Sequence, residues 1–392
     1  MVRGEAVREG RRVTELHPIA RLPDDWRAWV AARGERAFRA GAIFRWIHAR
    51  GVTDPARMTD LSLALRGALS ADGLGPTAAV GVVRQSADGT RKLVVTLGDG
   101  AAVESVLIPG VTGKHKFVDD ADAAAADDED DEAEEAGAVR VSQCISTQVG
   151  CAMGCAFCAS GVAGLKRHLG PEEIVGQVLL AKQLLRPGEQ LRNVVLMGMG
   201  EPLHNYDATA RALRLMTHPE GVGLSSRRVT VSTSGLVPEI ARLGADVGGH
   251  IGLAVSLHAT DDETRSRLMP INRRYPIATL LAALRAYPLP KRRRITIEYT
   301  LVSGRNDSPA EAKKLARLLE GLPVKVNLIP MNPISASTLG PPDRARVAGF
   351  QRVLTDAGYS CFVRKRRGDD VAAACGQLAL EGAAPKVRVD RS

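Results

Sequence analysis

The sequence predicts an α/β protein in which an open partial barrel of six βα units, a (βα)6 barrel, follows a small N-terminal helical domain. Two observations predict this fold. From residue 139 onward, short runs rich in β-branched residues alternate with helical patterns, as expected for a parallel sheet. Before residue 75, apolar residues recur at helical spacing instead. Six units fall short of the eight of a complete barrel, so we expect the barrel to stay open.

Residues 1–75 are predicted to form a basic helical accessory domain. The clearest helix, residues 37–48, has apolar side chains at intervals of three and four residues: Phe38, Ala42, Ile43, Trp46 and Ile47. Arg39, Arg45 and Arg50 lie on its other faces. We expect this domain to contact RNA, to cap the catalytic domain, or to do both.

Residues 76–110 are predicted to form a β-hairpin extension. Two β-type runs, at 93–97 and 102–109, flank the turn dipeptide Asp99-Gly100. Glu104 alternates with apolar neighbours in the second run. A lone Glu in a strand usually lies on the solvated face, so the pattern alone assigns Glu104 no function.

Residues 111–138 are predicted to be an acidic, disordered surface insertion. They consist mainly of Asp, Glu and Ala, with few large apolar side chains. Such a segment cannot bury enough surface to offset the entropy cost of ordering it. We prefer this interpretation to a specific acidic docking site.

Residues 139–380 are predicted to form the barrel, and residues 381–392 a C-terminal tail. Strands are expected at 139–146, 193–197, 228–232, 251–257, 294–299 and 324–329, with a further strand at 359–364. Helices are expected between them at 171–185, 208–216, 277–286 and 309–319. Because the carboxyl ends of parallel strands meet at one edge of the sheet, the chemistry is expected there.

A cysteine-rich loop follows the first barrel strand. Cys151, Cys155 and Cys158 form a C-x3-C-x2-C run, and Gly150 and Gly154 allow the backbone to fold tightly around it. A structural zinc site normally has four ligands, whereas three thiolates on a [4Fe-4S] cluster leave one iron open to a small molecule. The spacing therefore favours a cluster over zinc or a disulfide, although Cys144 could in principle be a fourth ligand.

Small polar residues follow several other barrel strands. They occur in Gly198-Met199-Gly200-Glu201-Pro202 and in the segments 232–235, 256–259 and 329–333. Together these segments are expected to line one rim that binds a cofactor with hydroxyl and carboxylate groups. Glu201 could accept hydrogen bonds from an ammonium group of such a cofactor.

The C-terminal region contains a basic cluster and a lone cysteine. The cluster at residues 364–367 could bind phosphates or be merely solvated. Cys375 lies in a turn of small residues from which its thiol could reach into a site, although a buried inert thiol is the usual outcome for an isolated cysteine. Cys361, in the last strand, is assigned that inert role.

The composition predicts a cytoplasmic protein with a polyanionic partner. No apolar run is long enough for a membrane span, no signal peptide is recognisable, and six unevenly spaced cysteines suit a reducing compartment. The net charge is +9 although residues 119–135 carry eleven acidic side chains, so the remainder is strongly basic. Nucleic acid is the usual partner of such a chain, the alternative being a solvated basic surface. The aromatic content of 4% argues against a base-stacking sheet.

The cysteine loop, with Phe157 before its last cysteine, resembles the cluster loop of radical S-adenosylmethionine (SAM) enzymes. In that superfamily the open iron binds the methionine moiety of SAM, and reductive cleavage yields a 5′-deoxyadenosyl radical. Over nearly its whole length, the chain resembles more narrowly the radical SAM adenine-C2 methyltransferases, which act on 23S ribosomal RNA (23S rRNA) and on certain transfer RNAs (tRNA). The matching segments are 38–47, 103–109, 148–158, 198–202, 227–235, 256–258, 328–333 and 364–378.

The resemblance implies a role for each candidate site residue. Cys151, Cys155 and Cys158 would bind one [4Fe-4S] cluster. The contacts to SAM would come from Gly200, Glu201, Ser232, Ser256, Leu257, His258 and Asn332. Cys375 would carry the methyl group and form a disulfide with Cys144 when the product leaves, while Glu104 would accept the proton lost from C2.

The chemistry of the target explains these residue types. C2 of adenine is an electrophilic carbon without a lone pair, so a thiol that carries the methyl group to it as a radical avoids an unfavourable direct transfer. By resemblance, two molecules of SAM are used per turnover, one for methylation and one for the radical. The resemblance also implies an electron donor such as a flavodoxin system, no membrane partner, and a monomer.

Two alternatives stay open at this stage. The related adenine-C8 methyltransferases of antibiotic resistance share the cluster, carrier and resolving cysteines, although residues 366–370 look more like the C2 branch. A non-catalytic RNA-binding protein held together by zinc would explain the basic charge but not Cys375. Three departures from the family pattern stand out: the acidic insertion between Glu104 and Cys144, His168 where Asn is common, and Met331 at a position that varies in the family.

Overall fold

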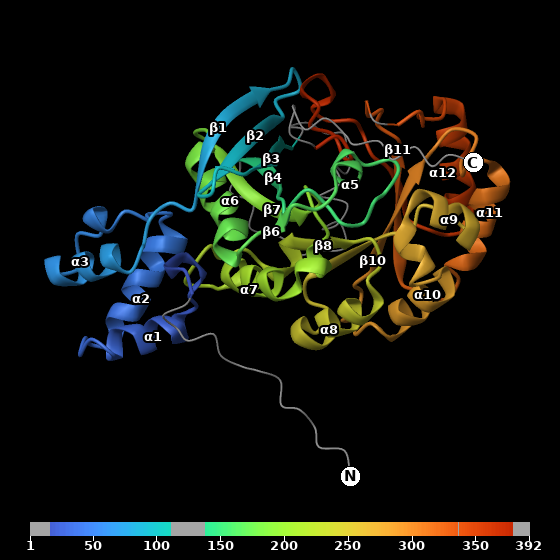
Figure 1. The fold of residues 1–392 in the computed structure, drawn as a ribbon. Helices are drawn as coiled ribbons and strands as arrows, with labels where there is room; N and C mark the ends of the chain where they lie inside the picture. The colour runs from blue at the N-terminus through green and yellow to red at the C-terminus, as the bar shows by residue number, and fades with distance from the viewer. Residues whose placement is uncertain (1–15, 111–137, 336, 379–392) are drawn as a thin grey trace, which may run out of the picture.

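The computed structural model describes residues 16–110, 138–335 and 337–378, and its centre is one ten-stranded sheet (Figure 1). The strand order is β1-β2-β3-β4-β7-β8-β9-β10-β11-β12. Pairing is antiparallel from β1 to β4 and parallel from β4 to β12. The predictions made for residues 1–15, for most of the acidic insertion (111–137) and for the tail at 381–392 lie outside the described residues.

The six predicted barrel strands are confirmed. They are β4 (Val139–Cys144), β7 (Glu189–Leu196), β8 (Val229–Thr233), β9 (Gly252–Ser256), β10 (Ile295–Leu301) and β11 (Val324–Pro330). A seventh parallel strand, β12 (Cys361–Val363), continues the sheet at the predicted place. Because β4 and β12 are not neighbours in the sheet, the barrel is open, as predicted for a partial (βα)6 fold.

Helices connect these strands, and four lie at the predicted positions: α6 (Pro171–Leu184), α7 (Tyr206–Thr217), α10 (Ile277–Ala286) and α11 (Pro309–Leu318). Local signals explain where they begin. The Ser308 side chain accepts a hydrogen bond from the N–H of Glu311 and Pro309 starts α11, while the Glu173 side chain accepts from the N–H of Gly170 at the start of α6. Further helices lie outside the predicted ranges: α5 (Ala159–Ala163), α8 (Val237–Val247), α9 (Asp262–Leu268) and α12 (Arg344–Asp356).

The N-terminal module is helical, as predicted, and lies to one side of the sheet (Figure 1). Its elements are η2 (Pro18–Ala20), α1 (Pro23–Ala31), α2 (Phe38–Phe44), the π-helix η3 (Arg45–Ala49), η4 (Pro55–Arg57) and α3 (Leu63–Ala71). The helix expected at 37–48 is therefore α-helical only as far as Phe44. Ile43 and Ile47 are buried, but Phe38 is 58% exposed and does not belong to the core.

The segment predicted as a β-hairpin extension joins the edge of the barrel sheet and has one strand more than the predicted hairpin. It forms three strands, β1 (Ala78–Gln85), β2 (Arg91–Leu97) and β3 (Ala102–Pro109), and the predicted turn between β2 and β3 contains Gly100 at φ +82°. Val106 of β3 is the antiparallel partner of Cys144 in β4. The strands on either side of the acidic insertion are thus paired with each other. A small second sheet joins β5 (Gln148–Val149) to β6 (Arg167–His168).

The solvated position expected for Glu104 is wrong. Its side chain is 2% exposed, and Glu104 Oε1 lies 3.0 Å from Lys92 Nζ. A buried carboxylate is costly without a compensating charge, so Glu104 needs the cation of Lys92 beside it. A single sequence cannot show that pairing, because Lys92 lies on the neighbouring strand β2.

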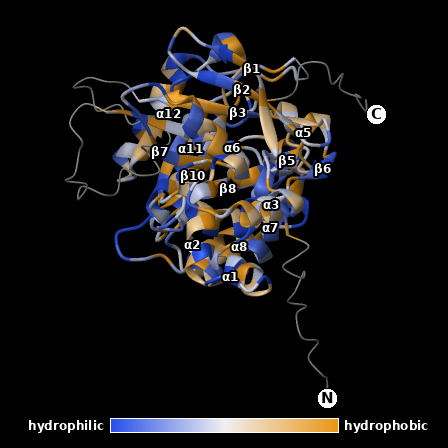
Figure 2. Ribbon diagram, turned by 90° about the vertical axis from the view of Figure 1, so that its left-hand side faces the viewer, coloured by the Kyte–Doolittle hydropathy of each residue, from blue (hydrophilic) through white to orange (hydrophobic). Residues whose placement is uncertain are grey.

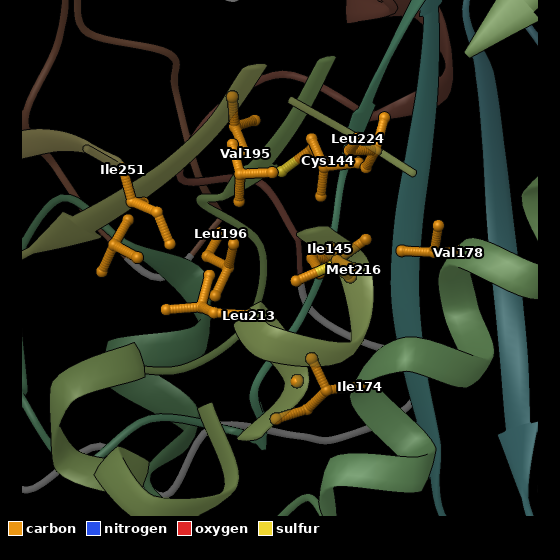
Figure 3. Packing of buried hydrophobic residues seen from close by; sticks show 14 of the residues in the cluster. Cys144, Ile145, Ile174, Val178, Val195, Leu196, Leu213, Met216, Leu224 and Ile251 are labelled. Atoms are coloured by element: carbon orange, nitrogen blue, oxygen red, sulfur yellow. The ribbon is translucent and has the colours of Figure 1, made fainter. Parts of the chain in front are cut away.

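The core lies between the sheet and the helices. Apolar residues gather on the strands and on the helix faces turned toward them (Figure 2). In one part of this core, Ile174 and Val178 of α6 and Leu213 and Met216 of α7 pack near the end of β4 (Figure 3). Each such side chain stabilises the fold by about 2 kcal/mol through burial. None of the helices in the described residues is long and apolar enough to cross a membrane.

Candidate active site

One cavity lies at the carboxyl ends of the barrel strands, where the sequence predicts the chemistry. Its wall contains the cysteine loop, Cys375, and residues at or just after the ends of β7, β8, β9, β10 and β11. We call it the main cavity. All the predicted metal and cofactor residues except Leu257 line it: Cys151, Cys155, Cys158, Gly200, Glu201, Ser232, Ser256, His258 and Asn332. Leu257 is buried elsewhere, so its side chain does not face the main cavity.

The cysteine loop is shaped by close backbone contacts that only glycine permits. Gly150 has φ +78°, and a Cβ there would lie 1.9 Å from the carbonyl oxygen of Gly164. A Cβ on Gly161 would lie 2.9 Å from the backbone nitrogen of Cys155. The loop is also tied to the chain around it, because the N–H of Ala156 donates to the carbonyl of Leu268 over 3.0 Å. The loop therefore holds its three thiols in one place.

The thiols of this loop are held in the protonated form by their surroundings. Burial raises the pKa of Cys151 to about 12 and that of Cys155 well above its usual value, and the negative charge of Cys158 contributes in both cases. Burial raises the pKa of Cys158 as well. Thiols in such surroundings ionise only when a cation compensates their charge, as a metal ligand requires.

The arrangement of the three thiols is compatible with a [4Fe-4S] cluster. In the described residues, no three His, Cys, Asp or Glu side chains gather around a point where one metal ion could sit. The three thiols nevertheless line one wall of the same cavity. A [4Fe-4S] cluster offers each thiolate a different iron, so its ligands need not converge on one point.

The loop after β7 is held by hydrogen bonds around Glu201. Its carboxylate accepts from the N–H of Ser234 over 2.7 Å and from the N–H of Leu203 over 3.1 Å, while burial raises its pKa. Gly200 (φ +109°) packs so closely that a Cβ would lie 2.7 Å from Cβ of Gln148. The Gln148 side chain also accepts from the N–H of Glu201 over 2.9 Å.

His168, the departure from the family pattern, supports this same loop. Gln148 Nε2 lies 3.0 Å from Nδ1 of His168 and 3.2 Å from Nδ1 of His204. The two imidazole rings meet edge to face, with centroids 5.1 Å apart. His168 therefore helps to orient Gln148, which in turn orients the backbone of Glu201.

Two residues of the site are absent from the sequence-based prediction, and the first is Glu298 of β10. It lines the main cavity, is 5% exposed, and accepts hydrogen bonds from Ser232 Oγ (2.8 Å) and Ser256 Oγ (3.4 Å). Its signal is the alternation in Ile295-Thr-Ile-Glu-Tyr-Thr-Leu301. Thr296, Glu298 and Thr300 share one face of that strand, and a Glu on such a face indicates a polar interior.

The second such residue is Arg265 of α9, which holds the ends of two neighbouring strands together. It is fully buried, and its guanidinium donates to the carbonyl oxygens of Leu257 (3.0 Å), Ser234 (2.8 Å) and Ser256 (2.9 Å). These bonds fix the segments after β8 and β9 next to each other. No local pattern distinguishes Arg265 from the other arginines of the chain.

His258 lies at the cavity wall as a neutral imidazole. Burial, together with the charge of Arg265, lowers its pKa to about 3. Its Nδ1 accepts from the N–H of Thr300 over 2.9 Å, so the ring proton is on Nε2. The residue has φ +56°, and its ring meets Phe157 of the cysteine loop edge to face with centroids 4.8 Å apart.

The structure brings Cys144 close to Cys375, although they are far apart in the chain. Cys375 lines the main cavity, and Asn332 Nδ2 donates to its carbonyl oxygen over 3.0 Å. Cys144, at the end of β4, is 5% exposed and packs near Val195 (Figure 3). Burial, and next the nearby Cys375, raise the pKa of Cys144 to about 12. Cys375 is only partly buried, whereas Cys361 is buried as predicted.

Glu104 does not reach the wall of the main cavity. It lies behind Lys92, whose Nζ also donates to the carbonyl oxygen of Ala372 over 3.2 Å. Ala372 precedes Cys375 by three residues. Glu104 is thus linked to the carrier segment through Lys92, but it does not share the cavity with Cys375.

Comparison with known proteins decides what kind of enzyme this is. Residues 145–318 match the radical SAM superfamily, and residues 23–72 match the ribosomal RNA large subunit methyltransferase N-terminal domain. The dual-specificity RNA methyltransferase RlmN of Sorangium cellulosum is 71% identical over 96% of this chain and 99% of its own length. The chain belongs to the RlmN family of radical SAM RNA methyltransferases.

Other relatives agree with this assignment. The dual-specificity RNA methyltransferase RlmN of Geotalea uraniireducens is 46% identical over 90% of this chain and 93% of its own length. The crystal structure of a radical SAM methyltransferase from Sphaerobacter thermophilus superposes with a TM-score of 0.81 at 40% identity, covering 92% of this chain and 98% of that one. A radical SAM family uses SAM and a [4Fe-4S] cluster, so the non-catalytic zinc alternative is set aside.

Proposed function

We propose that the protein methylates C2 of an adenine in 23S rRNA and in tRNA, with Cys375 as the methyl carrier. The observation that carries this proposal is the position of Cys375, on the wall of the main cavity with Cys144 next to it and the cysteine loop lining the same cavity. The names of the relatives at 71% and 46% identity support an RNA substrate. We further propose a cytoplasmic monomer that receives electrons from a flavodoxin-type donor.

The main cavity suits the two cofactors that the family implies. Cys151, Cys155 and Cys158 would hold one [4Fe-4S] cluster, and the remaining wall would hold SAM. Once bound, these cofactors would supply a methyl group from one SAM and a 5′-deoxyadenosyl radical from a second. We assign Glu298 to the hydroxyl groups of SAM, because a carboxylate that already accepts from Ser232 and Ser256 suits further hydroxyl donors.

Cys375 and Cys144 would then carry the methyl group to the RNA. The Cys375 sulfur would accept the methyl group from the first SAM, the methyl group would give one hydrogen atom to the 5′-deoxyadenosyl radical, and the resulting methylene radical would bond to C2. The adduct radical would then give one electron to an iron–sulfur acceptor and its C2 proton to a base, which restores the aromatic ring. The Cys144 thiolate attacks the Cys375 sulfur, so a disulfide forms, the carbon–sulfur bond breaks, and the released carbon takes up a proton.

Glu104 is proposed as the acceptor of the C2 proton. Its carboxylate is buried beside Lys92, and Lys92 contacts the carrier segment at Ala372. This assignment requires that RNA binding opens a path from the main cavity to Glu104. Glu104→Gln should then slow the release of methylated RNA without changing the iron content.

The proposal is tested by identifying the product. The reconstituted enzyme would be incubated with 23S rRNA fragments or tRNA, SAM and a reductant, and the nucleosides separated by mass spectrometry against 2-methyl- and 8-methyladenosine. We expect 2-methyladenosine, lost in Cys375→Ala and kept in the matched control Cys361→Ala. The appearance of 8-methyladenosine would assign the chain to the C8 reaction, and neither product from cluster-loaded enzyme would overturn the proposal.

A further inference from the structure

A second, smaller cavity lies against the main cavity on the other side of Cys375. Four consecutive cationic residues line it: Arg364, Lys365, Arg366 and Arg367. We call it the basic pocket. It shares Ile329, Asn332 and Cys375 with the main cavity, so the proposed carrier residue forms part of the wall between them.

The two cavities differ sharply in charge. No Lys or Arg lines the main cavity, and no Asp or Glu lines the basic pocket among the described residues. The positive charge next to Cys375 is therefore confined to one side of it. An anion that reaches the carrier would be attracted to the basic pocket rather than to the cofactor side.

Backbone contacts hold the cations of the basic pocket in position. Arg366 Nη2 donates to the carbonyl oxygen of Met331 and Arg367 Nη2 to that of Pro109, each over 3.1 Å. Two acidic side chains lie farther away, with Asp369 at 3.6 Å from Arg366 Nη1 and Asp88 at 3.8 Å from Arg367 Nη1. Charge-assisted hydrogen bonds are typically about 2.7–2.9 Å long, so these acids orient the guanidinium groups without binding them tightly.

The turn between β1 and β2 fastens the segment that follows these cations. Asp88 Oδ2 accepts from the N–H of Gly368 over 3.1 Å, and Asp370 Oδ2 accepts from the N–H of Ala87 over 3.1 Å. The chain between the basic residues and Cys375 is thereby tied to the antiparallel end of the sheet. The distance between the cations and the carrier is fixed by the fold and does not depend on a flexible linker.

We propose that the basic pocket binds one backbone phosphate of the RNA beside the target adenine. This inference rests on the proposed function, because it assumes that an adenine must be presented to Cys375. A phosphodiester is the one anionic group that every RNA nucleotide carries, and arginine side chains bind it with two parallel hydrogen bonds. Bound there, the phosphate sets the register of the strand, so the base next to it lies against the carrier.

The test pairs a protein variant with a chemical change in the RNA. A short RNA hairpin containing the target adenosine would carry a single methylphosphonate, which is uncharged, either 5′ or 3′ of that adenosine. Binding to the cluster-loaded enzyme would be measured for wild type and for Arg366→Gln. Arg285→Gln, which removes an exposed arginine of α10 on another part of the barrel, is the matched control.

We expect Arg366→Gln to weaken binding of unmodified RNA about tenfold. The number of counterions released on binding, measured from the salt dependence of the affinity, should fall by about one. One of the two methylphosphonates should weaken wild-type binding to the same extent, and it should cause no further loss in Arg366→Gln. Arg366→Lys should bind RNA more tightly than Arg366→Gln, because lysine keeps the positive charge. It should bind less tightly than wild type, because lysine cannot donate the two parallel hydrogen bonds of a guanidinium group. Affinity for SAM and iron content should stay at wild-type values.

Two results would overturn the inference. The first is that each of the two methylphosphonates weakens RNA binding by Arg366→Gln as much as it weakens binding by wild type, so that the losses add in full. The second is that Arg366→Gln weakens RNA binding no more than Arg285→Gln does. Failure of the proposed function looks different, because wild-type enzyme would then leave the unmodified hairpin unmethylated. The binding measurements distinguish the two cases, since they do not depend on turnover.

Discussion

Four cysteines line the main cavity and a fifth, Cys144, lies near Cys375, and these five fall into two groups that are built in different ways. Cys151, Cys155 and Cys158 come from one loop, which glycines and backbone contacts shape locally. Cys144 and Cys375 come from the end of the first barrel strand and from the segment after the last one. They approach each other only because the sheet curves between them. The first group is a local motif, and the second is a product of the tertiary fold.

This difference also separates two kinds of chemistry. Thiols of the loop need a metal to ionise, because burial and mutual repulsion keep them protonated otherwise. Cys144 is buried at the end of a strand, and its neighbour is another thiol. We expect changes in the loop to remove the cofactor, and changes in the pair to leave the cofactor but stop methyl transfer.

The largest expected effect comes from removing a loop thiol. Cys155→Ala should lose the cluster, and with it SAM cleavage and RNA methylation should both fall about a thousandfold or more, since the radical reaction needs the cluster. Cys375→Ala should keep iron and still form 5′-deoxyadenosine, but no methylated RNA. Iron content, visible absorbance and the two products would be measured together. A Cys155→Ala protein with normal iron content would contradict the division of the cysteines into a cofactor-binding loop and a methyl-transfer pair.

Removing the resolving thiol should stop the enzyme after one turnover. Without Cys144 the thioether between Cys375 and the RNA cannot be broken, so Cys144→Ala should accumulate a covalent protein–RNA adduct. Denaturing gels and mass spectrometry of the Cys375 peptide would detect it. Cys361→Ala, another buried cysteine, should release its product normally. Multiple turnovers by Cys144→Ala would show that Cys144 is not needed for release.

The release step should depend steeply on pH. The pKa of Cys144 is raised to about 12, mainly by burial, so the thiol is protonated near neutral pH. The thiolate fraction then rises tenfold per pH unit below that pKa, and the decay of the adduct should accelerate about tenfold per unit from pH 7 to pH 9. Single-turnover kinetics would measure this rate. A flat profile would mean that a neighbouring base removes the Cys144 proton.

Glycine substitutions beside the two groups of cysteines test the smallest expected differences between them. In Gly150→Ala the new methyl group would overlap the carbonyl of Gly164, so the variant should lose about 3 kcal/mol of stability or more, together with part of its cluster. In Gly376→Ala (φ +80°) it would lie 3.0 Å from the carbonyl of Phe157. Gly376→Ala should keep its cluster, but its rate of methyl transfer should fall about tenfold, because the new methyl group displaces the neighbouring Cys375.

A third glycine, Gly304, separates the cost of backbone strain from the cost of a steric clash. Gly304 has φ +68°, but a Cβ there would have no atom within 4 Å. Gly304→Ala should therefore cost only about 1 kcal/mol and leave activity unchanged. Thermal unfolding and iron content would be compared for all three variants. Equal losses in the three would indicate that backbone strain alone, and not close packing, accounts for them.

Much of the fold could be predicted from the sequence because its signals are local. The strands β7 to β11 are short runs rich in β-branched residues between turn residues, and the helices α6 and α11 begin at recognisable caps. The C-x3-C-x2-C loop and the glycines after β7 are equally local. Each of these features depends on residues a few positions apart, so a single chain is enough to find them.

The remaining features depend on contacts between distant segments. Glu104 appears solvated until Lys92 on the neighbouring strand encloses it, and Glu298 gains its role from Ser232 and Ser256 on two other strands. Arg265 joins the ends of β8 and β9, which no pattern connects in sequence.

By itself, the sequence determined the α/β class, the loop that would hold the cluster, and the residue types at the strand ends. Only the tertiary structure decided that Cys144 lies next to Cys375, that Glu104 is buried, and that a basic pocket adjoins the carrier. The physical reason is that burial and charge pairing arise from the curvature and pairing of the whole sheet, which brings together residues that no local periodicity relates.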